Sequence, residues 1–79
     1  MVSLKNLIDN GDTLECDYYP ENDMNNKCHL VIDKKTEEII SVSGGETKPS
    51  MYAGGARSKL AKYIGREDEF PEIEYCIWG

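Results

Sequence analysis

The residues of this sequence best suited to chemistry are three cysteines and one histidine: Cys16, Cys28, His29 and Cys76. Three thiolates and an imidazole form a donor set that could hold zinc in a tetrahedral site. Cys28 and His29, however, are neighbours in a predicted strand, where successive side chains point to opposite faces. No two cysteines have the short spacing of a zinc knuckle. We therefore predict no metal ligand and no cofactor, and interpret the cysteines as small buried apolar residues.

A cysteine nucleophile activated by His29 is the other chemistry that these residues could support. The opposite orientation of strand neighbours excludes Cys28 as the nucleophile. Cys16 or Cys76 would need a neighbouring strand to bring it to the imidazole. Cys16 also lies between two carboxylates in the sequence, and nearby negative charge disfavours the reactive thiolate. We predict no catalytic residue and expect the chain not to be an enzyme.

Carboxylate pairs and glycine-rich stretches are the remaining candidates for a site. Paired carboxylates cleave glycosidic bonds only when they flank a cleft and burial raises the pKa of one of them. A chain of 79 residues has little volume for such a cleft. The stretch 44–50, GGETKPS, contains glycine, lysine and serine, but not in the order of a phosphate-binding loop. We interpret the glycines as loop or packing residues, and as solvated charge the pairs Glu15/Asp17, Glu37/Glu38 and Glu67–Glu69.

Length, composition and charge restrict the class of protein. With 39% hydrophobic and 30% charged residues, the chain fits a single domain over residues 1–79 with a thin core. The net charge of −6 disfavours non-specific nucleic-acid binding, which needs a basic surface. No apolar run approaches the roughly 20 residues of a membrane helix, and no signal-peptide pattern is present. Because the cysteines are odd in number and lack a disulfide pattern, we expect a cytoplasmic protein.

The elements that must position these residues begin with a predicted hairpin of residues 2–8 and 13–19. Asn10-Gly11 is the strongest short signal for the turn between them. With this turn, Lys5 is expected opposite Cys16. The apolar side chains of the second run share the face of Cys16, and its acidic side chains point the other way. We predict that the face of Cys16 is the core face.

A second predicted hairpin consists of the runs 28–32 and 38–42, which are rich in β-branched residues, joined by the polar loop Lys34–Glu37. Its last loop position commonly has positive φ, where Glu37 would cost roughly 1 kcal/mol of strain. Both faces carry branched apolar side chains near the turn. The face away from the helix therefore needs a cover, a partner, or a β-bulge that shifts the alternation. The opposing pairs are expected to be Ile32 with Ile39 and Val31 with Ile40.

One helix and one further strand complete the prediction. Ser50 is a plausible N-cap for a helix from Met51 to about Ile64, and Gly65 would end it. Glu72–Trp78 alternates as a last strand. The fold class is α+β, an antiparallel sheet of four to five strands with one helix on one face, in the order of four strands, helix, strand. The apolar stripe of the helix consists of Ala53, Ala56, Leu60, Tyr63 and Ile64.

Three segments carry a resemblance to known sequences. The stretches ECDYYPE (15–21) and VIDKKTEEI (31–39), with the ending Ile77-Trp78, resemble a group of short uncharacterised proteins from Firmicutes bacteria. Members of that group tend to have glycine at the place of Glu37. The resemblance covers most of the chain, implies a bacterial cytoplasmic origin, and transfers no catalytic residue.

We therefore predict a non-enzymatic protein that acts through contacts with an unknown protein partner or through self-association as a homodimer. Binding of nucleic acid or membrane is not expected. The predicted interaction surface contains aromatic residues, which dominate binding hot spots, and apolar residues from the second hairpin: Tyr19, Val31, Ile40 and Trp78.

Two alternatives come from other classes of protein. The first is an acidic inhibitor or immunity-type protein that blocks a basic or nucleic-acid-binding site. It requires the carboxylates of residues 67–74 to share one face with Glu15 or Asp17. The second is a thiol- or metal-dependent protein that uses the cysteines and His29.

Overall fold

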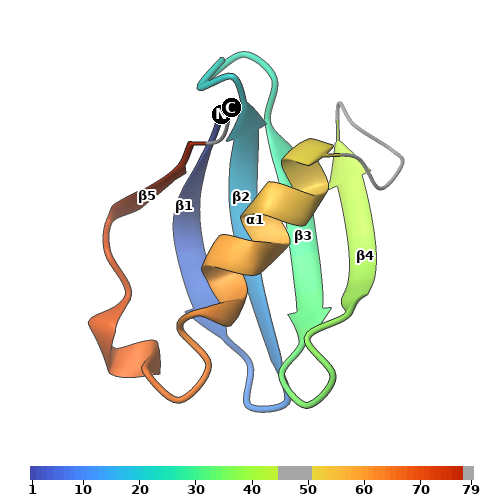
Figure 1. Ribbon diagram of the computed structural model, residues 1–79, viewed down its shortest axis with the longest axis vertical. Helices are drawn as coiled ribbons and strands as arrows, with labels where there is room; N and C mark the ends of the chain where they lie inside the picture. The colour runs from blue at the N-terminus through green and yellow to red at the C-terminus, as the bar shows by residue number, and fades with distance from the viewer. Residues whose placement is uncertain (45–50, 78–79) are drawn as a thin grey trace.

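The computed structural model describes residues 1–44 and 51–77 of the chain. These residues form five strands, one α-helix and one short 3₁₀ helix (Figure 1). The class is α+β with four strands before the helix and one after it, as predicted. The elements are β1 (Val2–Asp9), β2 (Thr13–Pro20), β3 (Cys28–Asp33), β4 (Ile39–Gly44), α1 (Met51–Ala61), η1 (Glu67–Glu69) and β5 (Ile73–Cys76).

The strands form one antiparallel sheet in the order β4-β3-β2-β1-β5, so the first and last strands of the chain are neighbours. Helix α1 crosses one face of this sheet diagonally (Figure 1) and contacts β1, β2, β3 and β5. The core lies between the two layers, and the face of Cys16 is the core face, as predicted. The core residues are Val2, Leu4, Leu14, Cys16, Tyr18, Cys28, Leu30, Ile32, Ala53, Ala56 and Leu60.

The first hairpin differs from the prediction in its register. The amide of Asn10 donates to the carbonyl of Thr13 (2.9 Å), so Asn10 still belongs to the paired strands. The chain therefore reverses one residue later than a turn at Asn10-Gly11 implies. A β-bulge, an extra residue in β1, reverses part of this shift, so that Lys5 lies opposite Asp17 rather than opposite Cys16. Asn6 sits in this bulge with φ 55°, a left-handed conformation that asparagine adopts more readily than most residues.

In the second hairpin, a β-bulge changes which apolar side chains share a face. Ile32 lies opposite Ile39, as predicted, but Val31 lies opposite Ser41 rather than Ile40, because Ile40 is an extra residue in β4. The bulge restores alternation, so that Ile39 and Val42 both pack against the core. Glu37 has the positive φ expected at the end of the loop (63°).

The helix and the last strand are shorter than predicted. Helix α1 ends at Ala61, and residues 62–64 continue in tighter turns in which each amide donates to the carbonyl three residues earlier. Strand β5 ends at Cys76. Ser50 and Trp78 lie outside the described residues. Within residues 1–44 and 51–77, no helix is long and apolar enough to cross a membrane.

Candidate functional site

Helix α1 leaves the second face of the sheet without a covering layer of helix or strand in the described part of the chain. We call this surface the open face. Strand alternation and register place side chains from all five strands on it. It combines charged side chains near the middle with apolar and aromatic ones around them: Lys5, Ile8, Glu15, Asp17, Tyr19, His29, Val31, Ser41, Ile73 and Tyr75.

An imidazole held between two carboxylates lies on the open face. Asp17 on β2 is directly opposite His29 on β3, and its Oδ1 is 2.8 Å from Nδ1 of the ring. Oε2 of Glu15, two residues earlier on the same side of β2, is 2.7 Å from Nε2. We call these three residues the His29 cluster. Their side chains are 36%, 25% and 10% exposed for His29, Glu15 and Asp17, respectively.

Two asparagines and a lysine complete the bonding of the His29 cluster. The Nδ2 of Asn6 donates to Oδ2 of Asp17 (2.8 Å), and the bulge in β1 brings this amide to the carboxylate. The Nδ2 of Asn10 donates to Oε1 of Glu15 (2.7 Å). The exposed ammonium of Lys27 lies 3.5 Å from Oδ2 of Asp17. Each carboxylate therefore has a bonded partner on both of its oxygens.

The protonation state of His29 follows from its partners. An ionised carboxylate only accepts hydrogen bonds, so each ring nitrogen must donate and the imidazole carries a positive charge. The bonds to Asp17 and Glu15 raise the pKa of His29, although partial burial opposes this rise. Partial burial also disfavours the charge on Asp17, but the bonds from Asn6 and His29 hold the pKa of Asp17 below its usual value. Bonds from Asn10 and His29 lower the pKa of Glu15.

The bonding of His29 limits the chemistry that it can perform. Both ring nitrogens are engaged by carboxylates, so neither is available to accept a proton from a nucleophile. The two carboxylates bind opposite nitrogens of the ring, and their oxygens do not converge on one point. Among residues 1–44 and 51–77, no group of three His, Cys, Asp or Glu side chains is arranged to hold a metal ion. The cluster is an ordered patch of charge.

The cysteines lie on the other face of the sheet from His29. Cys16 and Cys28 are buried in the core, and Cys76 is half-buried beside it. Burial raises the pKa of the Cys16 thiol far above its ordinary value. Cys76 lines a shallow groove of about 420 Å³ between α1 and β5. The predicted opposite orientation of Cys28 and His29 is confirmed, and neighbouring strands do not bring Cys16 or Cys76 to the imidazole.

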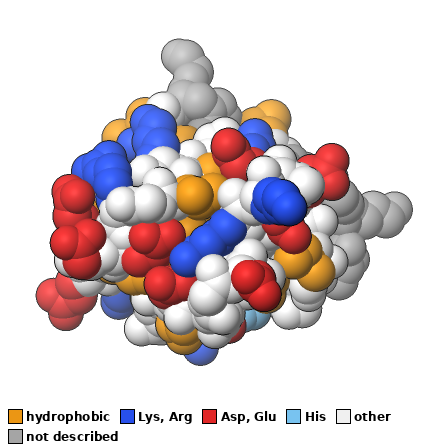
Figure 2. Space-filling view, turned by 90° about the horizontal axis from the view of Figure 1, so that it is seen from below, with side chains coloured by type: hydrophobic (Ala, Val, Ile, Leu, Met, Phe, Trp, Pro, Cys, Tyr) orange, Lys and Arg blue, Asp and Glu red, His pale blue; other side chains and the backbone are white. Residues whose placement is uncertain are grey.

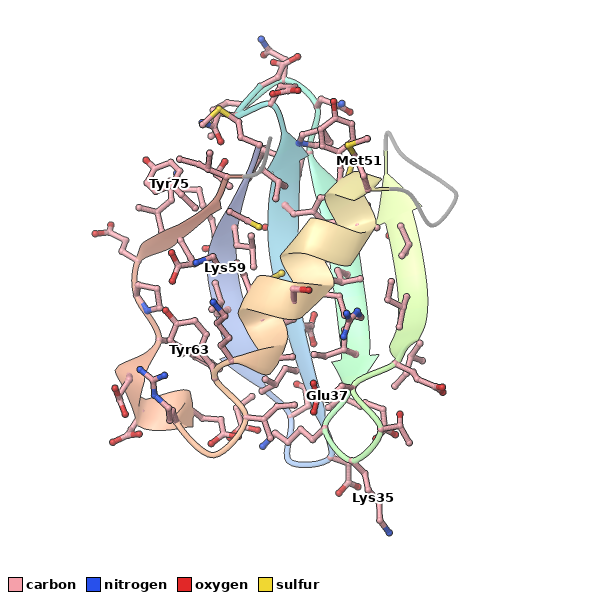
Figure 3. The ribbon with its side chains drawn as sticks, viewed as in Figure 1. Lys35, Glu37, Met51, Lys59, Tyr63 and Tyr75 are labelled. Atoms are coloured by element: carbon pink, nitrogen blue, oxygen red, sulfur yellow. The ribbon has the colours of Figure 1, made fainter. Side chains whose placement is uncertain are left out.

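The residues predicted as an interaction surface divide between two places. Val31 and Tyr19 both belong to the open face, where Val31 is half-buried and Tyr19 is only 7% exposed. Ile40 is 56% exposed at the bulge of β4, an edge strand of the sheet. Trp78 lies outside the described residues. Tyr75, 47% exposed on β5 (Figure 3), is an open-face aromatic in addition to the four residues of the predicted surface.

The interpretation as solvated charge is wrong for Asp17, whose side chain is only 10% exposed, and it describes Glu15 only in part. Both carboxylates are bonded to His29. The composition of the polar loop that joins the two hairpins does not indicate which residues of β2 and β3 lie opposite each other, so their register could not be predicted. Had that pairing been known, two acidic residues at i and i+2 on one face beside an outward-pointing histidine would have indicated the cluster.

The hairpin-loop end of the molecule carries a separate charge network. The Nζ of Lys34 lies 2.6 Å from Oδ1 of Asp9 and 3.0 Å from Oε2 of Glu67, and so links the second hairpin loop to the end of β1 and to η1. Figure 2 views this end and shows carboxylates interspersed with cations. Glu74, by contrast, lies on the helix side of β5, where it accepts a hydrogen bond from Tyr63 (2.6 Å). The acidic residues therefore do not form one face with Glu15 or Asp17.

Comparison with known proteins assigns neither a family nor a function to this chain. No protein-family model, no curated protein and no solved structure matches this chain.

Proposed function

We propose that this chain is a small non-enzymatic protein that acts by binding a protein partner through the open face. The observation that carries the proposal is that, among the described residues, α1 covers the sheet on one side only, while the second side carries an ordered, fully bonded charge cluster. Apolar side chains lie on the same face around that cluster: Val31 on β3 itself, Ile8 on the adjacent strand β1, and Tyr75 on β5 beyond β1.

The physical properties of the open face support recognition of a partner. Binding requires side chains to lose conformational freedom, and this loss weakens affinity. The side chains of the His29 cluster are already ordered by hydrogen bonds in the free protein. Their charges are paired, which lowers the cost of removing water from them compared with isolated charges. Half-exposed Tyr75 supplies a side chain of the kind that dominates binding energy at interfaces.

A cytoplasmic location in a bacterial cell is part of the same proposal. None of the three cysteines is in a disulfide, and two of them are buried in the core. Unpaired thiols in so small a domain favour a reducing compartment over an exported protein, which would use disulfides for stability.

The acidic inhibitor is less well supported than a partner of the open face. An inhibitor of a basic site would need its carboxylates to act together. Here Glu15 and Asp17 are engaged by His29, Glu67 by Lys34, and Glu74 by Tyr63, on different sides of the molecule.

The test is capture of partners from the cells that make the protein, with variants that change only one face. Val31→Lys adds a positive charge on the open face next to Glu15. Ser58→Lys adds the same charge at an exposed position of α1, on the other side, and serves as the matched control. We expect the native chain and Ser58→Lys to retain the same partner and Val31→Lys to lose it. Equal retention by both folded variants would contradict the proposal.

A further inference from the structure

The two edges of the sheet differ in how well they are protected against pairing with another strand. Natural edge strands avoid such pairing by being short, by carrying charges or proline, and by bulges. Strand β5 has these features, because it is four residues long, contains Glu74, and follows Pro71 and Glu72 closely. Two copies of β5 would also bring their glutamates together.

Strand β4 has less protection. Its six residues, IISVSG, contain no charged side chain and no proline, although the chain has a net charge of −6. Its one protective feature is the bulge at Ile40, near the hairpin loop. Ser41, Val42 and Ser43 beyond the bulge pair regularly with β3, and no described strand lies on their outer side. Ile40 itself exposes 56% of its surface at this edge.

We propose that β4 pairs in antiparallel orientation with β4 of a second copy of this chain, around a two-fold axis at Val42. Ser41 would then lie opposite Ser43 of the partner subunit, and both serines belong to the open face. No like charges meet in this register, so the acidic chain can approach its own copy along this strand.

This arrangement rests on the proposed function and extends it. A two-fold axis perpendicular to the sheet places the two open faces on the same side of one continuous sheet. Two open faces on one side can bind at the same time to a partner that presents two sites. This raises the overall affinity, although each individual contact is unchanged.

The experiment is measurement of molar mass by sedimentation equilibrium and light scattering over a range of concentrations, with two double variants of β4. In Ser41→Lys/Ser43→Lys, each lysine faces a lysine of the partner subunit. In Ser41→Glu/Ser43→Lys, each glutamate faces a lysine. Both variants change the same two exposed positions, and circular dichroism verifies that each is folded.

We expect a dimer for the native chain and for Ser41→Glu/Ser43→Lys. The dissociation constant of Ser41→Lys/Ser43→Lys should be at least about tenfold higher than that of the glutamate–lysine variant. A native chain that is monomeric at tens of micromolar would overturn the inference, as would equal dimerisation of the two variants. Neither result would affect capture of a partner by a monomer through the open face, which the Val31→Lys comparison tests separately.

Discussion

Replacement of His29 by leucine should destabilise the protein and change the way in which its stability depends on pH. The substitution removes the positive charge and both hydrogen bonds between Asp17 and Glu15, which lie at 2.8 Å and 2.7 Å from the ring. A hydrogen bond to a charged group contributes about 1.5–3 kcal/mol when buried. Because His29 is 36% exposed, solvent screening reduces each bond to about 1 kcal/mol.

The expected loss in His29→Leu is therefore about 2 kcal/mol in the free energy of unfolding. In a domain of this size, that corresponds to a fall of roughly 10 °C in the unfolding midpoint. Urea and thermal unfolding followed by far-ultraviolet circular dichroism would measure both quantities. A matched control is Ser58→Leu, which introduces the same residue at an exposed position of α1.

The pH profile gives the more specific readout. The pKa of His29 is raised in the folded state, so its stabilisation is fully present below about 6.5 and is lost as pH rises through the folded-state pKa. The pKa values of Asp17 and Glu15 are lowered, so their stabilisation is present above about 4 and is lost as pH falls through their folded-state values. The native chain should thus lose stability above pH 6.5, and His29→Leu should not show this loss. A variant that matched the native chain in both stability and alkaline profile would refute the assignment of His29 as a fixed cation.

Three further predictions follow from the backbone and the thiols. Glu37→Gly should stabilise the protein by about 0.5–1 kcal/mol in urea unfolding, because φ at this position is 63° and glycine adopts it without strain; a destabilised variant would contradict this reasoning. Asn6→Gly should cost about 1 kcal/mol through loss of the bond to Asp17, and Asn6→Ala about 1 kcal/mol more because alanine is strained at φ 55°; equal losses would mean that backbone conformation is not limiting. A thiol reagent should modify Cys76 in the native protein and all three cysteines in urea, and rapid native labelling of Cys16 would disagree with its burial.

The fold class could be predicted because local signals agree with it. The alternation along Thr13–Tyr18, the paired runs around Lys34–Glu37 and the apolar stripe of the helix each indicate an element and its buried side. Local sequence patterns do not indicate the positions at which the inward and outward alternation of a strand changes. The bulges at Asn6 and Ile40 each shift the register by one residue, and their positions depend on how strands distant in sequence fit together.

The candidate site was largely hidden for the same reason. Its three residues come from two strands joined by the polar loop 21–27, whose composition does not determine which residue of β2 faces His29. The bulge at Asn6 then supplies a hydrogen-bond donor to Asp17 that no pattern within β1 indicates. The opposite orientation of Cys28 and His29, in contrast, depends only on their adjacency in one strand, and it could be predicted.

The most direct test of the open face as a binding surface is site-specific photo-cross-linking in the cells that make the protein. A photoreactive amino acid is placed at Val31, on the open face, and in a matched chain at Ser58, on the exposed side of α1. We predict a discrete cross-linked species of higher mass from position 31 and none from position 58. Cross-linking from position 58 alone, or from neither position in chains shown to be folded, would contradict the account.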